Sequence, residues 1–200
     1  MNVKYYDILS SLITGYIVLV VSLFCMNIEY DSSYSVAYIA GALAIGYIIN
    51  AVSSLLETFY YFTIGGKPSE KLLTKKKGKD YTGIRKVRFY YCDEVTCKLR
   101  KDLQDENATI EKMFSHAKSQ ISGNNNSRVP DFNAHYAYAR SFLTIMLLFT
   151  IGIIAYSPCN WHSYLTIVPL FICWNRYREK GYYYAREVLN EYLKQQTIKK

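Results

Sequence analysis

The chain has 200 residues, half of them hydrophobic, and 24 basic against 16 acidic side chains give it a formal net charge of +8. Its mean hydropathy of −0.05 hides the apolar parts, because the rest of the chain is highly charged. Residues 8–28 and 32–56 form uncharged stretches of 21 and 25 residues. Because about 20 helical residues cross a bilayer core, these stretches exclude an ordinary soluble domain and predict an integral membrane protein.

The first uncharged stretch is predicted to be a membrane span; the alternative is a signal peptide. Only Lys4 supplies positive charge before it, and Phe24-Cys25-Met26 offers no small-residue cleavage site. Small and polar residues on one helical stripe predict a docking surface for the second span. That stripe comprises Ser11, Gly15, Val18, Ser22 and Cys25.

The second uncharged stretch predicts a helix with two different faces. One narrow side holds Ala42 followed by a polar stripe, which comprises Gly46, Asn50, Ser53 and Glu57. Small residues dominate the opposite side. Polar groups in a membrane helix usually face an interior or an aqueous cavity, so we predict a conduction path lined by Gly46, Asn50, Ser53 and Glu57. Alternatively, Asn50 makes an interhelical hydrogen bond and Glu57 reaches the cytoplasmic interface. Four spans cannot enclose a wide pore, so a channel implies a homo-oligomer, such as a tetramer.

The central segment, 65–139, carries 15 basic and nine acidic residues. It is predicted to be mainly helical, with Asn107 capping a helix over 108–121, a break at 123–127, and a further helix starting near Asp131. Basic residues interleaved with aromatics can bind phosphates and stack bases. We therefore predict contacts to a nucleotide or oligonucleotide; contact with anionic lipid, or no anionic ligand, are the alternatives. The predicted contact residues are Arg85, Arg88, Arg176 and Arg178.

A third apolar region of 35 uncharged residues lies between Arg140 and Arg176 and is interrupted at 157–160. Its halves, 141–157 and 161–175, would be helices of about 25 and 22 Å, which predicts a third and a fourth span. A re-entrant hairpin is the alternative. Pro169 should kink the fourth span or mark its irregular end.

The basic residues are distributed unevenly: one lies before the first span, 16 between Lys67 and Arg140, and seven from Arg176 onward. This bias predicts a multi-pass protein of the inner (plasma) membrane with both termini and the central segment in the cytoplasm. The C-terminal helix should continue the fourth span and pack against the central segment or against neighbouring subunits. The predicted divisions are a first helix pair at 1–64, the basic segment at 65–139, a second helix pair at 140–175, and an amphipathic helix at 176–200.

No catalytic or cofactor motif is visible. The chain has no Walker loop, HExxH, GxSxG or dinucleotide fingerprint. Cys92 and Cys97 lack the further ligands that zinc needs, and five cysteines spread over predicted spans and both sides allow no disulfide framework. We therefore expect no enzyme, no cofactor and no metal site.

The layout resembles the channel-forming membrane subunit of Hailong-type anti-phage defence systems. The resemblance rests on two spans before and two after a basic segment, and on two short patterns: 133–141 (NAHYAYARS), and 174–178 (WNRYR) with 184–188 (YAREV). It implies an oligomeric ion channel that damages the host membrane, an oligodeoxyadenylate-like ligand, and a nucleotidyltransferase partner.

Together these patterns predict an all-α protein with four transmembrane helices that forms a homo-oligomeric channel gated through its cytoplasmic segment. The main alternative is a non-conducting membrane adaptor that holds a cytoplasmic partner at the bilayer. A lipid-modifying enzyme comes third, because no nucleophile or acid–base pair is visible.

Overall fold

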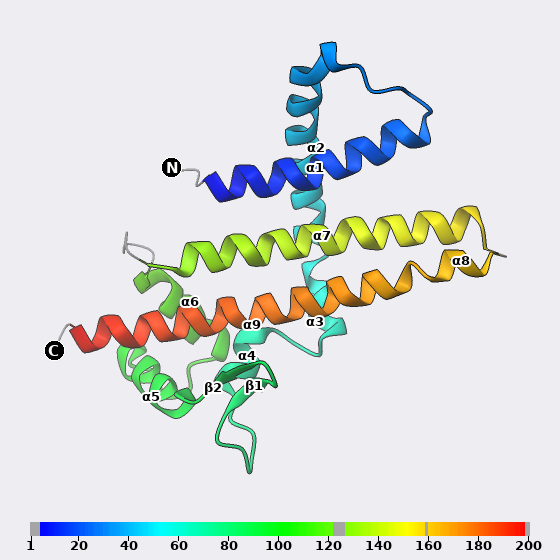
Figure 1. The fold of residues 1–200 in the computed structure, drawn as a ribbon. Coiled ribbons are helices and arrows are strands. Elements are labelled where there is room, and N and C mark those ends of the chain that lie inside the picture. Colours follow the sequence, from blue (N-terminus) through cyan, green and yellow to red (C-terminus); the bar gives the residue numbers. More distant parts are fainter. Residues whose placement is uncertain (1–4, 122–126, 159, 199–200) are drawn as a thin grey trace. The chain divides into compact units, whose positions relative to one another are not determined.

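The computed structural model describes residues 5–121, 127–158 and 160–198. Helices make up nearly all of its regular structure, and one two-stranded hairpin is the sheet within these ranges (Figure 1). The elements in chain order are α1 (Tyr5–Cys25), η1 (Ser32–Tyr34), α2 (Ser35–Leu55), α3 (Glu57–Thr63), α4 (Pro68–Leu73), β1 (Thr82–Ile84), β2 (Val87–Phe89), α5 (Cys92–Leu103), α6 (Ile110–Ile121), α7 (Val129–Tyr156), α8 (Trp161–Tyr164) and α9 (Ile167–Ile198).

The chain divides into two compact units. The first unit contains residues 1–60 and 134–177, and the second contains 61–133 and 178–200. Helices α7 and α9 each contribute residues to both units. The divisions predicted from composition, at 64/65, 139/140 and 175/176, stay a prediction.

Within the described residues, three helices are long and apolar enough to cross a membrane: Ile8–Cys25, Ser32–Leu55 and Val129–Tyr156. The protein is therefore a helical, membrane-associated protein. The region 161–175 is divided between α8 and the start of α9 and is not among these three, so a fourth span stays a prediction. Pro169 is the third residue of α9, in the first helical turn, where a missing N–H costs no helical hydrogen bond.

Helices α1 and α2 pack in direct backbone contact at two glycines. A Cβ atom on Gly15 would lie 1.7 Å from the carbonyl oxygen of Ala42, and one on Gly46 would lie 1.9 Å from that of Ser11. No larger residue fits at either position. The predicted docking stripe on α1 is confirmed at Ser11 and Gly15, whereas Ser22 is exposed. Small residues permit this approach in lipid, where no hydrophobic effect drives helix association.

The first unit also contains an antiparallel pair formed by α7 and the first part of α9. The rings of Tyr136 and Tyr177 stack with centroids 5.3 Å apart. At the other end of the pair, the Thr150 hydroxyl lies 3.5 Å from the carbonyl oxygen of Thr166.

The second unit has its own apolar core, built on the C-terminal part of α9. Tyr182, Val188 and Tyr192 of α9 are almost fully buried, and the Tyr192 hydroxyl donates to Asp102 of α5 over 2.6 Å. Side chains of α4, the hairpin, α5 and α6 complete the core, including Leu72, Val87, Phe89, Val95, Leu99 and Met113. The predicted packing of the C-terminal helix on the central segment is therefore confirmed.

The second unit differs from the sequence prediction in two details. The hairpin β1–β2 pairs Gly83 with Arg88. Gly83 has φ +105°, and a Cβ there would lie 2.3 Å from the Val87 carbonyl oxygen, so both the backbone conformation and the available space require glycine. Asn107 does not cap α6: the Thr109 hydroxyl accepts from the backbone N–H of Lys112, so the cap is two residues later. The predicted break at 123–127 lies mostly outside the described residues.

Candidate functional site

The first unit contains a largely buried ion pair between helices α3 and α7. Glu57, the first residue of α3, accepts from Arg140 of α7, with Oε2 and Nη1 2.7 Å apart. The Arg140 side chain is 12% exposed and that of Glu57 25% exposed. Both lie beside the apolar parts of their helices, where an isolated charge is costly and a paired one is a candidate for a functional site.

Arg140 also binds three polar side chains of α2. Its Nη2 atom donates to the Ser54 hydroxyl over 2.8 Å and to Asn50 Oδ1 over 3.3 Å, and its Nε atom donates to the Ser53 hydroxyl over 3.3 Å. Asn50, Ser53 or Ser54, and Glu57 follow one another at intervals of three or four residues, so they lie on one helical face. The guanidinium of Arg140 therefore contacts two successive turns, which run from α2 into α3. Each of the three guanidinium nitrogens of Arg140 therefore has an acceptor on α2 or α3, which offsets the cost of burying its charge.

The hydroxyls of Tyr136 and Tyr177 extend this network. Tyr136, one turn before Arg140, donates to Glu57 Oε1 over 2.7 Å, and its oxygen lies 2.9 Å from the Tyr177 hydroxyl of α9. Because the single hydroxyl hydrogen of Tyr136 points to the carboxylate, Tyr177 must be the donor of the second bond. The network thus joins α3, α7 and α9.

A second hydroxyl pair lies one turn further along α7. Thr144 donates to the carbonyl oxygen of Arg140 over 3.1 Å, so Tyr60 is the donor in the 2.8 Å bond between the Tyr60 and Thr144 hydroxyls. Both side chains are buried. We call the whole set the charged network; its members are Asn50, Ser53, Ser54, Glu57, Tyr60, Tyr136, Arg140, Thr144 and Tyr177.

The structure brings together three of the four residues predicted to line a path. Asn50, Ser53 and Glu57 share Arg140, whereas Gly46 lies apart, in contact with Ser11. The interhelical hydrogen bond considered for Asn50 is present. Within one chain the polar stripe faces α1 and α7, and the opposite, small-residue face is largely exposed. Pore lining in an assembly stays a prediction.

Sequence reasoning did not find Arg140, Tyr136 or Tyr177 as partners of the stripe. The available signal was the spacing Tyr136–Arg140–Thr144, which places a charge and two hydroxyls on one face of a helix. Arg140 stands immediately before the apolar region 141–157, and the sequence alone does not identify a partner for its charge.

The four arginines predicted to contact a ligand lie in different places. Arg85 and Arg88 are exposed on the hairpin of the second unit, Arg176 is exposed in the first unit, and Arg178 is half-buried in α9. Arg178 is close enough to Lys71 to lower the pKa of that amine, an effect second to burial. A ligand at any of these residues stays a prediction.

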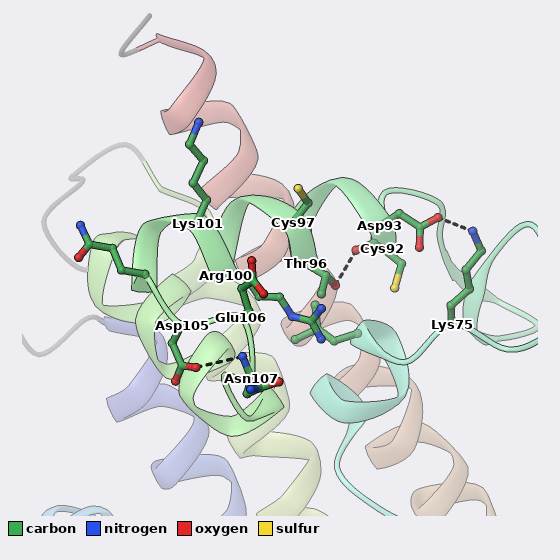
Figure 2. Close-up of a pocket in the computed structure, with 12 residues that line it drawn as sticks. Lys75, Cys92, Asp93, Thr96, Cys97, Arg100, Lys101, Asp105, Glu106 and Asn107 are labelled. Atoms are coloured by element: carbon green, nitrogen blue, oxygen red, sulfur yellow. Dashed lines mark hydrogen bonds and ion pairs between the residues drawn. The ribbon is translucent and has the colours of Figure 1, made fainter.

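The second unit has an open hollow of about 950 Å³ along α5 and the following loop. Figure 2 shows Lys75 paired with Asp93 at one end and Asp105 bonded to Asn107 at the other. The hydrogen bond to Asp93 raises the pKa of Lys75. Three basic and three acidic side chains line the hollow, so its charge favours no anionic ligand: Lys75, Arg100, Lys101, Asp93, Asp105 and Glu106.

Among the residues that the structure describes, no three His, Cys, Asp or Glu side chains are grouped so as to hold a metal ion. The cysteines described as free thiols are Cys25, Cys92, Cys97 and Cys173. Comparison of the chain with protein-family models, with curated proteins and with solved structures finds no match.

Proposed function

We propose that the protein is a homo-oligomeric membrane channel that the charged network holds closed. The observation that carries the proposal is the Glu57–Arg140 ion pair between α3, which follows the apolar helix α2, and the apolar helix α7. Charged pairs in such positions are expensive, and they recur along ion pathways and gates. Arg140 binds the stripe predicted to line the path, so separation of α2 from α7 would release Asn50, Ser53 and Glu57.

The proposed channel has four spans, with both termini and the second unit in the cytoplasm. Two features of the chain support this arrangement: the concentration of basic residues between Lys67 and Arg140, and the apolar region 161–175 opposite α7. Because α7 and α9 are continuous helices that contribute to both units, a change in the second unit can act on Arg140 and Tyr177. The nucleotide or oligonucleotide that would drive this change stays a prediction.

A non-conducting adaptor is the second candidate, and a specific observation favours it. Asn50, Ser53 and Glu57 each have a partner on α7 within one chain, so the stripe needs no water-filled path to satisfy it. An adaptor would use the network only to fix the helices and the second unit to hold a partner.

Ion flux from liposomes separates the two candidates. The wild-type chain, Glu57→Gln and Arg140→Gln are reconstituted at equal density, with Glu94→Gln as the control, because Glu94 forms an exposed pair with Lys98 in the second unit. A channel held closed by the network predicts higher basal flux for both network variants and wild-type flux for the control. Each protein is also tested with and without short oligonucleotides. Absence of flux from folded protein under all conditions would favour the adaptor.

A further inference from the structure

The excess positive charge of the central segment, 65–139, is concentrated in one short stretch, residues 75–91, which we call the basic hairpin. It holds seven of the 15 basic residues in 65–139 and only one of the nine acidic ones, Asp80. The rest of that segment holds eight basic and eight acidic residues and is neutral. The basic hairpin therefore accounts for the whole excess of six charges.

Membrane topology alone does not explain this concentration. The bias that orients a span is counted within about 15–20 residues of its end, and the basic hairpin starts at Lys75, 20 residues after the end of α2 at Leu55, and extends beyond that range. It also ends well before α7 begins at Val129.

The fold presents this charge on one side of the two strands. Val87 and Phe89 of β2 are buried in the core, whereas Arg88 between them is exposed. Opposite Arg88 stands Gly83, which has no side chain to cover it. The turn residues Arg85 and Lys86 are exposed at the tip, with Lys86 4.0 Å from Glu179.

Two tyrosines flank Arg88 on this exposed side. The Arg88 guanidinium lies 4.7 Å from the ring centroid of Tyr81, and the rings of Tyr81 and Tyr90 are 6.1 Å apart. Lys79 lies 6.0 Å from the Tyr81 ring. Tyr90 is 57% exposed and Tyr91 56% exposed, so the surface combines cations with amphipathic rings.

We propose that the basic hairpin docks on the anionic headgroups of the membrane in which the chain is embedded. Clustered cations are attracted to an anionic leaflet, and tyrosine rings are enriched at the level of the headgroups. A lipid surface is favoured over a small anion because the cations extend over a strand, a turn and a loop, and Lys75, which lines the hollow along α5, is paired there with Asp93. The second unit is tied to the membrane helices by its own chain, so docking needs little attraction per residue.

Hydrogen–deuterium exchange of the full-length chain in nanodiscs tests this proposal. Exchange in 75–91 is compared between phosphatidylcholine discs and discs that also contain phosphatidylglycerol. We expect slower exchange with the anionic lipid and loss of that protection at high salt, because exposed charges are screened. Equal exchange in the two lipids would overturn the proposal.

Double variants test which basic residues cause the protection of 75–91 by anionic lipid. Neutralising one cation should weaken docking about fivefold, so Arg85→Gln with Arg88→Gln should remove most of the protection. Lys76→Gln with Lys77→Gln tests the same surface from the loop, without touching a strand. Lys112→Gln with Lys118→Gln, on exposed positions of α6, is the matched control and should keep the protection.

Two further results would overturn the proposal. One is equal loss of protection in the α6 control, which would indicate a response to overall charge. The other is slower exchange with a short oligonucleotide in detergent where phosphatidylglycerol has no effect, which would assign the surface to nucleic acid. None of these results depends on ion flux, so the proposal can fail or hold independently of the channel.

Discussion

Replacing Glu57 and Arg140 by glutamine, singly and together, measures how strongly the ion pair couples α3 to α7. Breaking a fully buried pair costs about 3–5 kcal/mol, and an exposed pair contributes about 0–1 kcal/mol. The pair is 12% and 25% exposed, and Arg140 keeps its bonds to α2 when Glu57 is neutral. We therefore expect a coupling free energy of about 2 kcal/mol, between these two limits.

The assay is reversible unfolding of the full-length chain in detergent micelles, with the coupling taken from the double-mutant cycle. Glu94 and Lys98 provide a matched control, because their N–O distance is also 2.7 Å but their side chains are 52% and 32% exposed. That pair should couple by about 0.3–0.5 kcal/mol. Equal coupling for the two pairs would refute the argument that burial makes the Glu57–Arg140 pair strong.

Glycine substitutions test the packing of the first unit, and cysteine labelling tests that of the second. Gly46→Ala should destabilise the chain by about 3 kcal/mol in thermal unfolding, because the methyl group meets the Ser11 backbone. Gly152→Ala is the control and should not destabilise the chain, because Gly152 faces open space. Similar unfolding midpoints for the two variants would contradict the close α1–α2 contact. In maleimide labelling followed by peptide mass spectrometry, exposed Cys97 should react quickly. Buried Cys92 should react slowly and faster as the pH rises, because burial raises the pKa of its thiol; equal rates would contradict this burial.

The length of the uncharged stretches was sufficient to predict the long apolar helices, and helical spacing predicted the continuous C-terminal helix. Helical spacing also identified Asn50, Ser53 and Glu57 as one stripe, because it places them on one face. It could not identify the partner of the stripe: Arg140 follows Glu57 by 83 residues, and only the packing of α7 on α2 brings them together.

Other differences arise where local signals compete. The strands β1 and β2 have three residues each, too few for an alternating pattern to be distinguished from a loop. Asn107 and Thr109 are both good capping residues, and the cap falls on Thr109 because the backbone N–H of Asn107 bonds to Asp105 in a turn of its own. Which face of α2 packs within the chain also depended on the tertiary fold.

Single-channel recording in planar bilayers tests the central claim most directly, with the wild-type chain compared with Glu57→Gln. If the charged network holds a channel closed, the variant opens more often than the wild type, since Arg140 loses its strongest partner on α3. Discrete currents that are absent or rare in the wild type and frequent in the variant are the predicted result. A variant that is folded, assembled and silent in the bilayer would contradict the account.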